Sequence, residues 1–241
     1  MKKFITLLLF LFSLNVFASS SAHLESADID VSDKASLKRG AKTFVTYCLG
    51  CHSAKHIRYK RIAMDFGLND AEVLKDIAPE GAAIYDQMHS AMNGHDANKW
   101  FGTEPPDLSL IARSRGADWL FSYLKGFYVD KSKPMGVNNT VFEDVGMPNM
   151  LWQLQGLQAP VYEDTKEGEP KVIEKLEIVE EGTQTPEQFD QTVNDLVNFL
   201  QYIGEPVQVE RERMGKYVLF FFFMFIVLAY LLKKEYWKDV H

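Results

Sequence analysis

The chain has 241 residues, a formal net charge of −7 and only two cysteines. Two cysteines are too few for a cysteine-only zinc site, which takes about four ligands. The acidic balance gives no reason to expect a nucleic-acid partner, and we predict none. Two apolar runs lie near the ends of the chain, and roughly 190 residues lie between them, enough for one hydrophobic core.

The first apolar run has the pattern of a secretory signal. Lys2 and Lys3 precede an uncharged stretch at residues 4–14, and the small residue Ala18 follows shortly after it. A run this short does not span a bilayer. We therefore expect export, with cleavage after Ala18, and exclude residues 1–18 from the fold.

The second apolar run, residues 217–232, predicts a membrane anchor. Its sixteen residues carry no charge, and as a helix they cover about 24 Å, slightly less than the ~30 Å hydrocarbon core. Flanking lysines can snorkel to close the gap. We expect an exported domain at residues 19–213, a transmembrane segment at 214–234 and an inner tail at 235–241.

The motif Cys48-Leu-Gly-Cys51-His52 is the attachment signature of a c-type haem. The two thiols would add to the porphyrin vinyl groups as thioethers, and the following histidine would come under the ring as an axial iron ligand. We therefore predict Cys48, Cys51 and His52 as cofactor-binding residues, with His52 bound to the iron.

Other chemistries of a C-x-x-C pair fit the sequence less well. A redox pair favours a βαβ context, and no such pattern surrounds Cys48 and Cys51. A zinc site lacks further cysteines. A disulfide across two residues would be strained.

Two amphipathic helices should frame the motif. Asp33 can cap a first helix that leads into Cys48. Gly40 and Phe44 precede Cys48 by eight and four residues, a spacing that resembles the first helix of class I cytochromes c. In that class the glycine permits a close crossing by the last helix.

The sequence also predicts the last helix of the domain. Thr185 and Gln188 form a capping box around Pro186, and an apolar stripe continues to Ile203. We expect Gly40 and Phe44 of the first helix to meet the turn at residues 199–202.

The middle of the chain predicts further helices and loops. We expect helices at residues 69–77 and 82–92, a loop at 93–106, a helix at 107–125 and a long irregular stretch at 126–149. Such a long loop is usually functional.

Residues 161–163 and 171–179 favour two strands of a surface hairpin. The predicted fold is therefore mainly α: a class I cytochrome c-like haem domain with large insertions, a small β-hairpin and one C-terminal transmembrane helix.

A second axial ligand would make the haem an electron carrier, and methionine sulfur would raise its potential relative to a second histidine. Of the nine methionines, Met88 and Met92 are spaced one helical turn apart and are expected to fill core space. Spacing alone does not choose among Met135, Met147 and Met150.

Four stretches together resemble the cytochrome c1 family, the haem c subunits of bacterial quinol–cytochrome c reductases (bc1 complexes). They are CLGCHSAKHIRYKR at 48–61, EPPDLSLIARSR at 104–115, FYVDKSKPMGVNNTVFEDVGMPN at 127–149, and residues 211–216 before the anchor. The resemblance runs in order through nearly all of the mature chain.

The resemblance implies roles for further residues. The family's second iron ligand is the methionine of its G-M-P segment, which here is Met147, with Met150 as the runner-up. Pro106 lies in the P-P-D-L-S segment that the family places beside the haem. Arg115 matches an arginine near the haem propionates, and Arg113 is its alternative.

The resemblance also implies the function: one covalently bound haem c that passes single electrons from a Rieske-type iron–sulfur protein to a soluble or anchored cytochrome c. Cytochrome b and the Rieske subunit would be partners in a bacterial inner membrane. The haem domain would be periplasmic and the C-terminus cytoplasmic. The subunit would belong to an oxidoreductase without a substrate-converting site of its own. The alternatives are a free-standing anchored carrier and, less favoured, a haem peroxidase or gas sensor.

Overall fold

The computed structural model describes residues 24–163 and 172–239. The predicted signal at residues 1–18 and the predicted hairpin turn lie outside these ranges. Within them, helices dominate, and three two-stranded antiparallel sheets lie at the periphery. The predicted fold class is confirmed.

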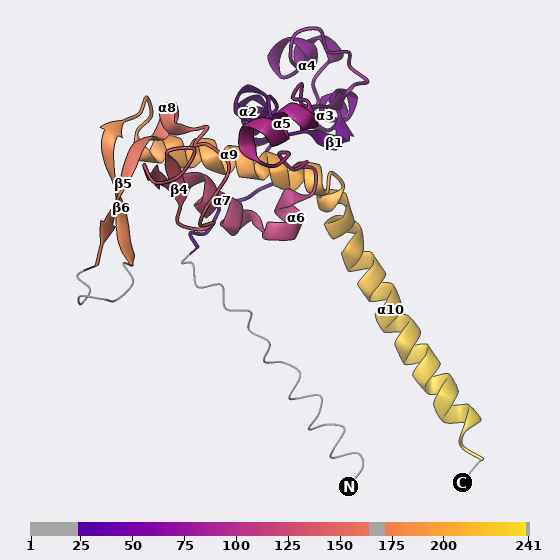
Figure 1. The fold of residues 1–241 in the computed structure, drawn as a ribbon. Helices are drawn as coiled ribbons and strands as arrows, with labels where there is room; N and C mark the ends of the chain where they lie inside the picture. The colour runs from indigo at the N-terminus through magenta and orange to yellow at the C-terminus, as the bar shows by residue number, and fades with distance from the viewer. Residues whose placement is uncertain (1–23, 164–171, 240–241) are drawn as a thin grey trace.

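The centre of the domain is the crossing of α2 (Lys34–Tyr47) and α9 (Pro186–Gly204). Asp33 caps α2 through Ala35 N and Ser36 N, and Thr185 forms the predicted capping box with Gln188. Figure 1 shows α9 running through the middle of the molecule. Both predicted helices are confirmed.

Gly40 allows the two helices to touch. A Cβ atom at this position would lie 1.9 Å from the Asp195 carbonyl oxygen and 2.8 Å from Phe199 Cβ. The rings of Phe44 and Phe199 pack with centroids 5.6 Å apart. The predicted contact of Gly40 and Phe44 with Phe199 is therefore confirmed, and Gly40 also lies against Asp195, one turn closer to the start of α9.

Three short elements follow the Cys48–His52 motif: β1 (Ala54–Arg58), α3 (Tyr59–Phe66) and α4 (Asp70–Asp76). Asn69 caps α4 in a capping box with Glu72, in agreement with the helix predicted at 69–77.

The helix predicted at residues 82–92 is wrong. Gly81 has φ of 83°, and the Asp86 carboxylate accepts a hydrogen bond from Ala83 N at 2.8 Å. Such a local bond competes with helix formation. The chain instead forms β2 (Gln87–Met88), which pairs with β1 and buries Met88 completely. Met88 and Met92 therefore do not share a helix face.

The loop predicted at residues 93–106 contains a helix, α5 (Gly94–Phe101). Asn93 caps it through His95 N, and Gly102 ends it with φ of 74°. Glycine and asparagine, interpreted as loop residues, are here the two helix caps.

The helix predicted at 107–125 is divided in two. Gly116 takes φ of 92° and separates α6 (Ile111–Arg115) from α7 (Ala117–Lys125). The stretch predicted as irregular at 126–149 contains a small hairpin, β3 (Phe127–Val129) and β4 (Val137–Asn139).

The predicted surface hairpin is present as β5 (Gly156–Tyr162) and β6 (Ile173–Glu181), entered from the short helix α8 (Trp152–Gln155). The strand β5 is longer than predicted, and β6 has the predicted length but begins two residues later. In Figure 1 this hairpin projects at the end of the domain opposite α10.

The last helix, α10 (Gln208–Tyr236), extends away from the domain, as Figure 1 shows. It is the one helix within the described ranges that is long and apolar enough to cross a membrane, and none of its apolar window is buried. It begins six residues before the predicted transmembrane segment, so the anchor continues the helix that leaves the domain.

Candidate haem site

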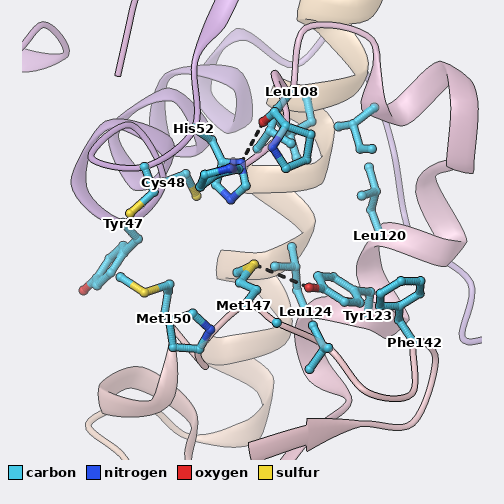
Figure 2. Close-up of a pocket in the computed structure, with 18 of the residues that line it drawn as sticks. Tyr47, Cys48, His52, Leu108, Leu120, Tyr123, Leu124, Phe142, Met147 and Met150 are labelled. Carbon is cyan, nitrogen blue, oxygen red and sulfur yellow. Dashed lines mark hydrogen bonds between the residues drawn. The ribbon is translucent and has the colours of Figure 1, made fainter. Parts of the chain in front are cut away.

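A cavity of about 290 Å³ opens between the Cys48–His52 motif and the segment around Met147. Helices α6, α7 and α9 supply apolar side chains to its wall, as does the loop after α5. These lining residues are Leu108, Ile111, Leu120, Leu124, Leu196 and Leu200. The predicted motif and the predicted methionine, about a hundred residues apart in sequence, thus face the same space (Figure 2).

The two thiols lie where α2 ends. Cys48 N donates to Phe44 O at 2.8 Å, and His52 N donates back to Cys48 O at 2.8 Å, so the motif forms a tight turn at the cavity wall. Neither cysteine forms a disulfide. Burial, together with the nearby Cys51, raises the pKa of Cys48 to about 12.

This position argues against the rival chemistries of the pair. Redox-active C-x-x-C cysteines have a lowered pKa, often at a helix N-terminus, whereas Cys48 lies at the C-terminal end of α2. Within the described ranges, no group of three or more His, Cys, Asp or Glu side chains could hold a metal ion.

His52 is held by one ring nitrogen. Its Nδ1 lies 2.8 Å from the carbonyl oxygen of Pro106. A carbonyl only accepts, so Nδ1 carries the proton and Nε2 keeps its lone pair. Burial lowers the pKa of His52, against the opposing effect of the Pro106 bond. The neutral ring is the form that ligates a metal.

Met147 lies across the cavity from His52 in Figure 2. Its Sδ accepts a hydrogen bond from the Tyr123 hydroxyl at 3.4 Å. Met150 also lines the cavity, but Figure 2 places it to one side, near Tyr47. Met135 does not line the cavity.

Tyr123 is fixed by aromatic neighbours. Its ring stacks on Trp119 at a centroid distance of 4.9 Å and meets Phe127 edge-on at 5.2 Å. Burial raises its pKa to about 12, so its hydroxyl stays protonated and able to donate at neutral pH. Sequence reasoning missed this residue; its one signal was the spacing of Trp119 and Tyr123 one turn apart on a helix.

The two candidate arginines occupy different environments. Arg115 lines the cavity, with its guanidinium carbon 5.0 Å from the Trp119 ring centroid. Arg113 does not line it and pairs with Glu205 at 2.7 Å. Of the two, only Arg115 therefore has its charge at the cavity.

The residues present fit a c-type haem. An apolar cavity has two thiols on its wall, an imidazole with a free Nε2 and a thioether sulfur facing that imidazole. Pro106 also lines the cavity, and its carbonyl orients the imidazole. These are the donor types that hold haem in c-type electron carriers.

Comparison with known proteins matches most of this chain to one family model and to several relatives. The model of the cytochrome C1 family matches residues 26–240. The cytochrome c1 of Allochromatium vinosum is 52% identical, covering 91% of this chain and 90% of that protein. The ammonia monooxygenase gamma subunit of Nitrosomonas europaea is 45% identical, covering 90% and 89%. The cytochrome c1 of Rhodobacter capsulatus is 24% identical, covering 85% and 83%.

The match to the family model spans most of the chain, including the motif, the cavity and the apolar helix α10. It implies haem c as the cofactor and membrane anchoring, as the cavity and α10 independently suggest. The chain therefore belongs to the cytochrome c1 family, the c-type cytochromes of bc1 complexes.

Proposed function

We propose that this chain binds one haem c covalently through Cys48 and Cys51 and passes single electrons, with His52 and Met147 as the axial ligands. The observation that carries the proposal is the placement of His52 and Met147 on opposite sides of one cavity whose wall holds both thiols. When bound, the haem iron supplies one-electron chemistry.

The protein's share of the task is ligation, orientation and exclusion of water. Pro106 holds the His52 ring, and Tyr123 holds the Met147 sulfur. The leucines of α7 and α9 keep the cavity apolar, and Arg115 places a positive charge there that suits a propionate.

Two axial ligands would leave no open iron position, which argues against a peroxidase or gas sensor. We propose a Rieske-type iron–sulfur protein as the electron donor and a soluble or anchored cytochrome c as the acceptor, with cytochrome b as a further partner. In this arrangement residues 19–213 lie on the periplasmic side of a bacterial inner membrane, and the end of α10 faces the cytoplasm. No substrate bond is broken at this subunit.

The attachment is tested on a denaturing gel, because thioether bonds survive unfolding. On the gel, the full chain should retain its haem, and Cys51→Ala should keep at most one thioether link. In a separate optical measurement, His52→Ala should lose the low-spin spectrum. Complete extraction of haem from the unmodified chain would contradict covalent attachment.

Whether this chain is a subunit of a bc1 complex is tested by purification in mild detergent. A bc1 subunit should bring a b-type haem and an iron–sulfur protein with it. A chain that purifies alone, with its own haem intact, would instead be a free-standing carrier.

A further inference from the structure

The carbonyl that orients His52 belongs to a loop without helix or strand, residues 102–110. Pro105 and Pro106 have no backbone N–H, so they cannot tie this loop to its neighbours by donating. Yet the Pro106 oxygen must stay within 2.8 Å of His52 Nδ1. Other residues must therefore hold the loop against the motif.

Three hydrogen bonds join the loop to the residues that follow His52. Leu108 N donates to Ser53 O at 2.8 Å. Lys55 N donates to Asp107 Oδ2 at 3.0 Å. The Ser109 hydroxyl accepts from His56 N at 3.1 Å.

Asp107 accepts hydrogen bonds both from within the 102–110 loop and from the residues that follow His52. Its Oδ1 accepts from Ser109 N within the loop at 2.9 Å, while Oδ2 accepts from Lys55 N across the junction. Only an ionised carboxylate offers both oxygens as acceptors in this way. Asp107 is also the residue next to Pro106, so its position sets where the Pro106 carbonyl points.

We infer that Asp107 is a positioning residue for the proximal ligand: its carboxylate holds the Pro106 carbonyl in place and thereby sets the plane of the His52 imidazole. The inference rests on the proposed role of His52 as an axial ligand. Groups that orient a metal-bound imidazole through its second nitrogen also tune its donor strength. Asp107 would thus affect the haem without touching it.

The test compares two substitutions in the full-length haem protein. Asp107→Asn keeps the size but leaves one oxygen, so either Ser109 N or Lys55 N then faces an amide NH₂. Asp107→Ala removes both acceptors. If Asp107→Ala does not fold, Asp107→Asn decides the question.

Asp130→Asn is the matched control. Asp130 makes the same Asp-x-Ser turn, with its Oδ1 accepting from Ser132 N at 3.0 Å, but it lies on the β3–β4 turn and does not line the cavity. The control removes the same charge within the same kind of turn.

The readouts are the haem-methyl proton shifts of the ferric protein and its reduction potential. The methyl shifts depend on the plane of the axial imidazole, so neither a loss of charge alone nor a loss of fold stability alone reproduces their change. We expect Asp107→Asn to add or broaden haem-methyl resonances and to raise the potential, with a larger effect for Asp107→Ala. Asp130→Asn should retain the parent pattern.

Methyl shifts in both Asp107 variants that match those of Asp130→Asn would overturn the inference and leave the proposed function standing. A parent protein without a low-spin haem spectrum would instead overturn the proposed ligands, before any variant is compared.

Discussion

The hydrogen bond from Tyr123 to the Met147 sulfur links an aromatic stack to a proposed iron ligand. A donor on the sulfur withdraws electron density from it and favours the ferrous state. Replacing Tyr123 by Phe keeps the ring and removes the donor. We expect the reduction potential to fall and the free energy of unfolding to drop by about 1 kcal/mol, the usual worth of one hydrogen bond.

Tyr47→Phe is the control for this prediction. Tyr47 also lines the cavity, and among the described residues its hydroxyl has no hydrogen-bond partner. Equal potentials for the two variants, measured by redox titration, would mean that the Tyr123 hydroxyl does not act on the haem.

Met147 itself is tested by Met147→Leu, which keeps the volume and removes the sulfur. Volume-conserving core changes usually cost less than about 1.5 kcal/mol, so the domain should stay folded while the potential falls and the ferrous iron binds carbon monoxide. Met150→Leu, at the neighbouring methionine in the cavity, should keep the parent properties. The reverse outcome would move the ligand to Met150.

The residues of the site were predicted unevenly, for physical reasons. Cys48, Cys51 and His52 follow from a contiguous motif. Met147 came only from a family resemblance, because the contact across the cavity depends on how α7, α9 and the 142–150 segment pack. Tyr123 was not predicted, since nothing local marks a tyrosine that donates to a sulfur twenty-four residues away.

At the scale of elements, those that local sequence marks were predicted correctly, and those that depend on tertiary contacts or on less obvious caps were missed. Helices α2 and α9 carry strong caps and long apolar stripes, and both were predicted. The strand β2 was missed because its pairing with β1 and the burial of Met88 are tertiary effects. The helix α5 was missed because Asn93 and Gly102 were interpreted as loop residues rather than caps.

The α2–α9 crossing gives a prediction at this scale. Gly40→Ala would place a Cβ 1.9 Å from the Asp195 carbonyl oxygen, a backbone atom in the middle of a helix. The helices must then separate, and we expect a loss of about 3 kcal/mol, at the upper end of the usual overpacking cost. Thermal unfolding of the full-length protein in mild detergent measures it.

Gly215→Ala in α10 is the control, because its Cβ would meet nothing within 4 Å. Alanine is also the better helix former. If Gly40→Ala were as stable as this control, the close crossing would not depend on the glycine.

For the whole molecule, the helix α10 should be separable from the haem domain. Glu205 forms ion pairs with Arg113 of the haem domain and with Arg211 of α10, so these contacts hold the start of α10 against the domain. Truncation after Arg213 keeps these contacts and removes the apolar run. We expect a soluble, exported domain with the parent haem spectrum; a folded product that has lost this spectrum would show that the two parts are coupled.

The acidic segment at residues 163–190 gives a prediction about partners. It holds ten acidic residues against three lysines. In the structure Lys175 pairs with Glu177, and Asp190 pairs with Lys125, while Glu180 and Glu181 stay exposed at the end of β6. Some of these acids serve local ion pairs, which leaves the exposed ones free to steer a basic cytochrome c.

Reversing Glu180 and Glu181 to Lys should therefore slow electron transfer to a basic cytochrome c at low salt and flatten its salt dependence. Screening grows as the Debye length falls from about 10 Å at 0.1 M to about 3 Å at 1 M. Reversing Glu80 and Glu210, two exposed acids outside the hairpin, is the control. Stopped-flow rates with the same salt slope for both double variants would leave solubility as the role of the hairpin charge.

The central claim is that His52 and Met147 both ligate one haem iron in the intact protein. Adding carbon monoxide to the ferrous, full-length protein in mild detergent tests it most directly, because the gas needs an open iron position. We predict a low-spin optical spectrum that carbon monoxide leaves unchanged. A rapid shift to the spectrum of a carbon monoxide complex would show an open position and contradict the ligation of Met147.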